Sequence, residues 1–314
     1  MSAKAKIFTA LRFFASGYFK LDPPSVKHSI IEVLDAFEKA RLSDEFIRFP
    51  STLDELRKSE AAFYRRFGFP GVVGCIDCTH VAIVAPSNSK NVSQHLYVNR
   101  KKYHSINVQL ICDSRLRITN VNPRFPGKAH NSRIWNSSKI KTIMEEVHKV
   151  NPNQFHLIGD SAYALRPWML TPIEGAAEGS PESEYSECQM EVHSAIKRVN
   201  GLLKKSFRCL LHCLHFDPVT ATRIVKACCV LHNMLRDEIM GESDSSDSDD
   251  AIESDDSDDS DDSDTEYADA GIISLNYNQK GAGESLPETS ANPQLTEGRM
   301  KQQKIVKSHF NYVQ

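Results

Sequence analysis

The segment that decides the fold reads Pro70-Gly-Val-Val-Gly-Cys-Ile-Asp-Cys-Thr-His80-Val-Ala-Ile-Val84. Its run of β-branched and apolar residues predicts a strand over residues 72–84, with one carboxylate, Asp77, in the middle. Burying a lone carboxylate is costly unless the group is paired or binds a cation. Asp77 therefore either holds a cation or has a structural role, in which it caps a turn or pairs with Arg100 or Lys101.

A second acid follows a similar apolar run later in the chain. Asp160 comes directly after Phe155-His-Leu-Ile-Gly159, which predicts a short strand over residues 154–159. Carboxylate oxygens are the ligands that hard divalent cations prefer. Two aspartates on separate strands strengthen the interpretation that the chain has a cation site.

Helical spacing of apolar residues predicts helices on both sides of these strands. Strand-rich stretches with interleaved helices indicate an α/β fold, with a mixed sheet flanked by helices. The expected elements are a helical region over residues 5–49 interrupted at Pro23-Pro24, helices over 51–67, 131–150, 191–211 and 219–239, strands over 105–113 and 116–122, and a loop over 174–187.

Charge is distributed unevenly along the chain. The 314 residues include 38 Lys and Arg and 41 Asp and Glu. Residues 242–269 contain 15 of these acids and no Lys or Arg, so the rest of the chain has a net charge of +12. A basic body is typical of proteins that bind a polyanion such as nucleic acid, although a soluble basic domain has the same composition.

The acidic stretch alternates Ser with Asp and has almost no apolar residues. Such a segment cannot collapse into a core, so we expect residues 241–314 to be a disordered acidic tail, which leaves room for only a short helix near the C-terminus. Four roles fit this composition: a solvating tail, a substrate of acidophilic kinases, a mimic of DNA that covers the basic body, or a segment that binds histones or other basic partners.

The segment around Asp77 resembles the first catalytic segment of PIF/Harbinger DDE-type transposases, and most closely that of their domesticated, transposase-derived nucleases. Any one block of similarity is a weak signal, but the blocks follow the family order over about residues 70–233. They are Tyr97-Val-Asn-Arg-Lys101, His104-Ser-Ile-Asn-Val-Gln109, residues 121–135, Leu157-Ile-Gly-Asp-Ser-Ala-Tyr163, Pro167-Trp-Met-Leu-Thr-Pro172, residues 193–210 and Cys228-Cys-Val-Leu-His-Asn233.

The resemblance implies an RNase H-like fold in three parts. These are a helical N-terminal region over residues 1–69, a DDE superfamily endonuclease domain over 70–240 and the acidic tail over 241–314. It also implies a nuclease that hydrolyses DNA phosphodiester bonds with Mg²⁺ or Mn²⁺. By position in the family motifs, Asp77 and Asp160 are the catalytic acids that bind the metal.

Two further metal-ligand positions of the family have other residues in this chain. Asn131 stands where the family usually has Asp, and Lys197 stands where the family has Glu. An amide oxygen can still bind a cation, whereas a protonated lysine has no lone pair and repels the metal. We therefore expect catalysis to be weakened or lost.

Two alternatives to an ordinary nuclease follow from these substitutions. The chain can be a catalytically silent module that binds nucleic acid or protein on the old scaffold. Alternatively, the Lys197 ammonium replaces the second metal ion as a fixed cation, which would make a one-metal nuclease of Asp77, Asp160 and Lys197.

Basic residues near these positions are candidates for contacts with DNA phosphates. Arg100 and Lys101 precede a predicted strand, and Lys204 and Arg208 lie on the predicted helix that carries Lys197. A solvated helix face would have the same pattern. The helix-turn-helix of the family is not recognisable between residues 19 and 33, so we expect non-specific DNA binding.

The resemblance also implies a partner and a location. Relatives of this kind act with a separate Myb/SANT-like DNA-binding protein, so we expect such a partner and a nuclear location, with the cytoplasm as a second compartment. The sequence predicts no membrane segment, no signal peptide and no disulfide framework. Cys75 and Cys78 are interpreted as core thiols rather than zinc ligands, and no metal role is assigned to the cluster of Cys209, His212, Cys213 and His215.

Overall fold

A five-stranded mixed sheet forms the centre of the computed structural model, which describes residues 1–17, 24–87, 93–243 and 292–310. The strands are β1 (Val72–Ala82), β2 (Ser105–Cys112), β3 (Ile118–Pro126), β4 (His156–Ile158) and β5 (Met169–Leu170). The helices are α1 (Ala3–Ser16), α2 (Pro24–Lys39), α3 (Leu42–Phe46), α4 (Leu53–Phe67), α5 (Asn131–Asn136), α6 (Lys139–Val150), α7 (Pro181–Ser206), α8 (Pro218–Ser243) and α9 (Pro293–Ile305), with short turns η1 (Gln94–Leu96), η2 (Arg208–Leu210) and η3 (Val306–Phe310).

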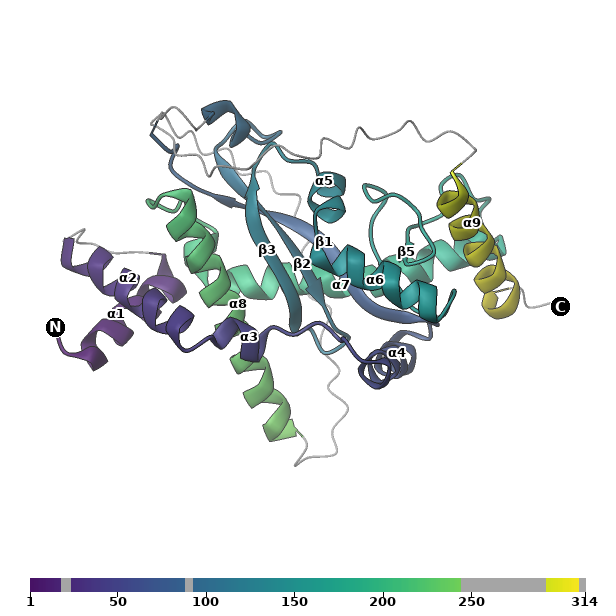
Figure 1. The fold of residues 1–314 in the computed structure, drawn as a ribbon, viewed down its shortest axis with the longest axis horizontal. Helices are drawn as coiled ribbons and strands as arrows, with labels where there is room; N and C mark the ends of the chain where they lie inside the picture. The colour runs from purple at the N-terminus through teal and green to yellow at the C-terminus, as the bar shows by residue number, and fades with distance from the viewer. Residues whose placement is uncertain (18–23, 88–92, 244–291, 311–314) are drawn as a thin grey trace.

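The strands lie side by side in the order β3-β2-β1-β4-β5 (Figure 1). Strands β1, β2 and β3 form an antiparallel meander, whereas β4 runs parallel to β1 and β5 parallel to β4. The registers place Asp77 opposite Leu110 of β2, and Cys75 opposite Ile158 of β4. Every residue of β2 is buried, as expected of a strand that is covered on both faces.

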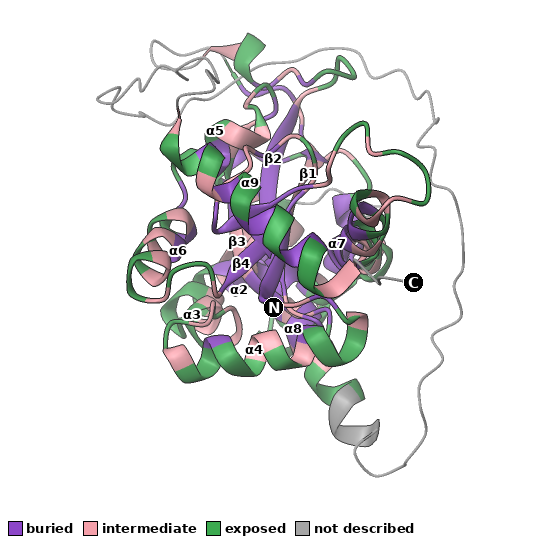
Figure 2. Cartoon of the chain, turned by 90° about the vertical axis from the view of Figure 1, so that its right-hand side faces the viewer, coloured by how far each residue is buried: buried purple, intermediate pink, exposed green. Residues whose placement is uncertain are grey.

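Helices cover both faces of the sheet. On one face α7 and α8 pack against the antiparallel strands, and their apolar side chains share a core with Cys75 and Val81 of β1. On the other face Trp135 of α5 and Met144 of α6 share a second core with Ile76. Figure 2 shows buried strands inside helices whose outer sides are exposed. The predicted α/β fold with a mixed sheet flanked by helices is confirmed.

The N-terminal helices belong to the larger core. Phe13 of α1 packs edge-on against Phe216, with ring centroids 5.6 Å apart. Arg223 of α8 donates from Nε to Glu38 of α2 at 2.8 Å and also pairs with Asp35. These contacts join the helical N-terminal region to the C-terminal half of the domain. Residues 18–23, where part of a helix-turn-helix was sought, lie outside the described residues.

Several elements differ from the sequence predictions, and three of the differences have a clear cause. Helix α7 begins at Pro181, because the Ser180 hydroxyl caps it by accepting the Ser183 amide at 3.2 Å, so the loop predicted over 174–187 is wrong in its second half. The predicted helix over 131–150 is two helices, because Ser138 caps α6. Strand β5 was not predicted, since two residues carry no pattern.

The tail predicted over residues 241–314 needs correction at its C-terminal end. Helix α9 packs against β5, at the edge of the sheet (Figure 1). Lys301 of α9 is only 4% exposed, and its Nζ donates to the carbonyl oxygens of Phe155 at 3.1 Å and Pro167 at 2.7 Å. Phe155 directly precedes β4 and Pro167 lies two residues before β5, so α9 fixes the edge of the sheet.

The acidic stretch begins in the last residues of α8, and from residue 244 on it lies outside the described residues. Its expected disorder and its four possible roles therefore stay predictions. The short helix that the sequence allowed near the C-terminus corresponds to α9, which Asn292 caps by accepting the Gln294 amide at 3.0 Å.

Lys301 makes the stability of the fold depend on pH. Burial lowers the pKa of Lys301 from 10.5 to about 7, with Glu60 and Glu297 acting in the opposite direction. Between these two values the unfolded chain keeps a proton that the folded chain has lost, so the free energy of unfolding rises with pH. Relative to Lys301→Met, the native chain should gain about 1–2 kcal/mol between pH 7 and pH 9. Urea denaturation of both chains measures this, and parallel pH profiles would contradict it.

Candidate active site

The pairing of β1 with β4 brings the two predicted acids together. Because Cys75 lies opposite Ile158 in parallel strands, Asp77 and Asp160, each two residues further along, reach the same end of the pair. Asp77 lies within β1, and its Oδ1 accepts the backbone amide of Cys78 at 2.7 Å. Asp160 follows β4, and its Oδ1 accepts the amide of Ala162 at 3.1 Å.

Helix α7 carries Lys197 to this pair of acids. Two contacts hold α7 against β1: Cys75 Sγ donates to the carbonyl of Val192 at 3.2 Å, and His193 Nε2 is 3.1 Å from the carbonyl oxygen of Ile76. Lys197 is one helical turn after His193, on the same face of α7. The lysine that replaces the family glutamate is therefore directed to the acid site.

The charges at this site interact. Burial raises the pKa of Asp77 to about 6, against an ordinary value of 3.8, and the Cys78 amide opposes that shift. The neighbouring charge of Asp160 raises the pKa of Asp77 further, and that of Lys197 lowers it. His193 is buried, which lowers its pKa, and it too lies within the influence of Asp160 and Lys197. From the neighbouring helix, the exposed Lys197 thus opposes part of the unfavourable charge at Asp77.

Asn131 lies on the opposite side of β1 from α7. Its Oδ1 accepts a hydrogen bond from Asn107 Nδ2 at 3.2 Å, and Asn107 pairs with His80 across β1 and β2. Asn131, Asn107 and His80 line a cavity of about 650 Å³. Ala162, from the loop that carries Asp160, lines the same cavity, so this loop connects the position of Asn131 with the acid site.

Most of the predicted phosphate-binding residues gather around this cavity. Arg100 lines it together with Lys102 and Lys128. Burial lowers the pKa of His80, and the positive charges of Lys204, Arg100 and Lys101 lower it further, which places all three cations near this histidine. Arg208 is the exception, because it begins η2, which packs against α1.

The donors at the site fit one hard cation better than two. Among the described residues, no group of three or more His, Cys, Asp and Glu side chains is arranged to hold a metal ion. Asp77 and Asp160 supply two carboxylates, and Mg²⁺ is often held by one or two carboxylates with water and substrate phosphates. Lys197 brings a positive charge where a further ligand would lie, which disfavours a second ion.

Sequence reasoning missed three residues of this region. His193 anchors α7 on β1, Tyr163 lies with its hydroxyl 3.5 Å from Cys78 Sγ, and Asn107 contacts Asn131. His193 and Asn107 fall within the blocks of family similarity, and Tyr163 ends another. Those blocks were the available signal, but only the folded sheet shows which side chains of a block face the site.

The cysteines do not form the alternative zinc site. Cys75 faces α7 and Cys78 faces the opposite side of β1, as alternation along a strand requires. Burial raises the pKa of Cys78 to about 12, so its thiol stays protonated. Cys209 lies 3.9 Å from Cys228, sulfur to sulfur, as a thiol pair in the core.

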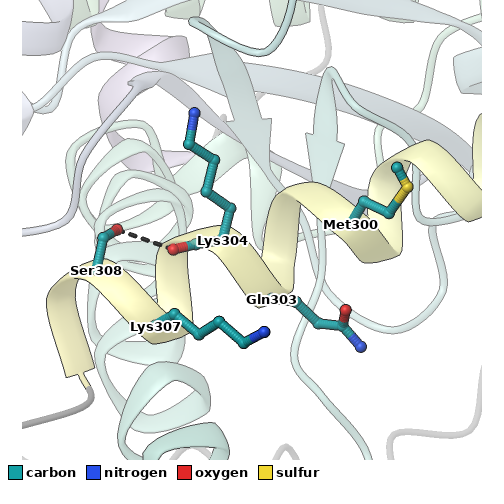
Figure 3. Close-up of a pocket in the computed structure, with 5 residues that line it drawn as sticks. All are labelled: Met300, Gln303, Lys304, Lys307 and Ser308. Carbon is teal, nitrogen blue, oxygen red and sulfur yellow. Dashed lines mark hydrogen bonds between the residues drawn. The ribbon is translucent and has the colours of Figure 1, made fainter.

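A second pocket, of about 390 Å³, lies on the outward face of α9 and η3 (Figure 3). Its lining side chains are those of Met300, Gln303, Lys304, Lys307 and Ser308, all from one continuous helical segment. No other described element contributes a group to it, so we assign no function to this surface. Within the described parts of the chain, every helix is too short or too polar to cross a membrane.

Comparisons with known proteins cover the part of the chain that carries these residues. The family model described as DDE superfamily endonuclease matches residues 76–233. The chain is 32% identical to "Putative nuclease HARBI1" of Homo sapiens, with 74% of this chain and 67% of the human protein covered. It is 33% identical to the Mus musculus protein of the same name (76% and 69% covered) and 24% identical to "Protein ALP1-like" of Arabidopsis thaliana (76% and 61% covered). No solved structure matches the chain.

The charge of Asp77 should destabilise the fold in the absence of metal. Because its folded-state pKa of about 6 exceeds the ordinary 3.8, the folded chain binds the extra proton between these values and loses stability as pH rises through them. We expect Asp77→Asn to raise the free energy of unfolding by about 1–3 kcal/mol at pH 7 in EDTA, and by much less near pH 4.

Urea denaturation at both pH values measures this effect. The matched control is Glu238→Gln, which removes an exposed carboxylate of α8 and should change stability little at either pH. A chain made less stable by Asp77→Asn at pH 7 would show that the carboxylate stabilises the fold even without a metal ion.

Proposed function

Because the chain belongs to the PIF/Harbinger DDE-type transposase family and carries its DDE superfamily endonuclease domain, we propose that it hydrolyses DNA phosphodiester bonds with a divalent metal, weakly. The observation that carries the proposal is the acid pair, Asp77 and Asp160, at the same end of two paired strands. The weakness follows from Asn131 and Lys197, which replace acids of the family.

The sheet supports an RNase H-like assignment. Its order, β3-β2-β1-β4-β5, with an antiparallel meander on one side of β1 and parallel strands on the other, is the arrangement that we expect of that fold. In this arrangement the acids of β1 and β4 are neighbours, and α7 crosses the face of the sheet beside them. The fold thus accounts for three positions of the family motif: Asp77, Asp160 and Lys197.

The residues have separate roles in the proposed reaction. Asp77 and Asp160 would hold one Mg²⁺ or Mn²⁺, which when bound supplies Lewis acidity at the phosphodiester. Lys197 neutralises part of their charge and so lowers their affinity for a cation. His193 positions α7, and with it Lys197, through its contact with the carbonyl of Ile76.

The proposed substrate is DNA bound without sequence specificity. Arg100, Lys101 and Lys204 lie around His80 beside the acid site, where cations can contact the phosphates that flank the cleaved bond. Arg208 lies at the turn η2, so we assign it at most a peripheral contact. A nuclear location, with the cytoplasm as a second compartment, and a Myb/SANT-like partner that supplies sequence recognition complete the proposal.

A silent nucleic-acid-binding or protein-binding module is the second candidate. Lys197 favours it, because a lysine directed at two carboxylates can satisfy them in place of a metal ion. In this case the basic residues around the cavity would still bind DNA, and the family scaffold would be kept for binding alone.

Plasmid cleavage in Mn²⁺ distinguishes the two candidates. We expect slow nicking by the native chain, none by Asp77→Ala, and nicking at least about 100-fold faster by the Asn131→Asp/Lys197→Glu double variant, since a close charge pair contributes a few kcal/mol. The rate of loss of supercoiled plasmid measures all three.

The controls decide between the outcomes. Native and double-variant chains that cut equally fast would show that the two substitutions do not weaken catalysis. A native chain that does not cut, beside an active double variant, would identify this chain as the silent module. Isothermal titration with Mn²⁺ adds a readout that does not depend on cleavage, because the double variant should bind the ion more tightly.

DNA binding is tested separately, in EDTA, by its salt dependence. Arg100→Gln and Lys204→Gln should each weaken binding to duplexes of any sequence and reduce the slope of log K against log salt by about one. Lys58→Gln is the matched control, since this exposed lysine belongs to α4, near the opposite end of β1 (Figure 1). Equal losses in all three variants would show that the cavity cations are not the DNA-binding surface.

A further inference from the structure

The cavity beside the acid site has the size and the lining to bind more than a phosphate group. It lies between β1, β2, the start of α5 and the segment that follows η1, and its volume of about 650 Å³ is that of a small-molecule site. Val98, Ala129 and Ala162 give it apolar wall surface. A flat heterocycle could therefore lie against its walls.

The floor of the cavity offers an unused hydrogen-bond acceptor. Asn107 is only 1% exposed, and its Nδ2 donates to the carbonyl of Ala129 at 2.9 Å and to Asn131 Oδ1 at 3.2 Å. Its Oδ1 is buried and has no partner among the described residues. An unpaired buried acceptor costs about 1–3 kcal/mol. Because this oxygen has almost no accessible surface, a ligand N–H group reaches and satisfies it only when the side chains around it move aside.

The rim of the cavity is positively charged. Arg100, Lys102 and Lys128 line it, and no carboxylate is found among its described lining residues. His80 also lines the cavity, and its Nδ1 is 3.0 Å from the Ser105 hydroxyl. Because burial and the nearby cations lower the pKa of His80, the imidazole stays neutral and can donate from Nε2. The rim therefore suits an anion.

We propose that this cavity binds one unstacked nucleotide, with its phosphate at the rim cations and an N–H group of its base at Asn107 Oδ1. The inference rests on the proposed DNA-binding role and deepens it, because it names the part of the substrate that enters the protein. Extrusion of a base from the duplex is a known way to bring a nucleotide into a pocket. A free mononucleotide has the same chemistry.

The first test uses the native chain in EDTA, so that cleavage has no part in it. We expect deoxyadenosine monophosphate to bind about 5–10-fold more tightly than the analogue that carries unsubstituted purine and so lacks only the amino group. Both should bind more tightly than inorganic phosphate. Isothermal titration measures the three affinities.

Variants of the floor and the rim separate the two contacts. Asn107→Leu should bring both nucleotides to the same affinity. Since this substitution leaves the Ala129 carbonyl without its donor and can unfold the chain, the exposed pair Arg100→Gln/Lys128→Gln provides an independent test. This double variant should bind both nucleotides about 10-fold more weakly and keep their ratio.

Two DNA ligands identify the source of the nucleotide. If a duplex with one unpaired adenine binds more tightly than the fully paired duplex, the pocket takes a nucleotide of a DNA strand. If the two duplexes bind equally, the pocket takes a free mononucleotide. The pocket is refuted if deoxyadenosine monophosphate binds no better than phosphate, or if Arg100→Gln/Lys128→Gln leaves its affinity unchanged. Such a result would not contradict the proposed nuclease activity, because plasmid cleavage tests that activity separately.

Discussion

The parallel pairing of β1 with β4 is the constraint on which the rest of the structure depends. It places Asp77 and Asp160 at the same end of two neighbouring strands, inside a sheet that helices cover on both faces. A half-buried carboxylate such as Asp77, with the charge of Asp160 nearby, is unfavourable without a cation. The raised pKa of Asp77 is the direct expression of this cost, and a metal ion or a lysine is what can offset it.

In this chain a side chain of the protein, Lys197, offsets part of the unfavourable charge at the acids. Helix α7 is fixed to β1 through Cys75 and His193, and the next turn of the helix presents Lys197 to the acids. The positive charge of Lys197 lowers the pKa of Asp77, and the same charge would repel a metal ion at these acids. The charge of Lys197 therefore has opposite effects on the metal-free fold and on the metal binding that the proposed hydrolysis requires.

The sequence predicts the central strand, because runs of apolar and β-branched residues are typical of buried strands. It also predicts both acids, since Asp77 interrupts such a run and Asp160 follows another. It also predicts the conflict at Lys197, through the family motif. It could not predict that Asn107 contacts Asn131, since that contact depends on the register of β2 against β1 and on where α5 begins. The sequence also does not predict the packing of α9, because a polar helix with few apolar residues gives no sign that Lys301 is buried.

The two faces of β1 divide the chemistry of the site. Alternation along the strand sends Asp77 toward α7 and sends Cys78 and His80 toward the cavity of Asn107 and Asn131. The acids and the nucleotide-sized cavity are therefore separated by a single strand and joined at its end by the loop of Ala162. A nucleic acid that crosses this end can meet the carboxylates with its backbone while one base enters the cavity. An aspartate at position 131 would face this cavity, on the other side of β1 from Asp77. Its effect on cleavage therefore depends on the loop of Ala162, which connects the two faces of the strand.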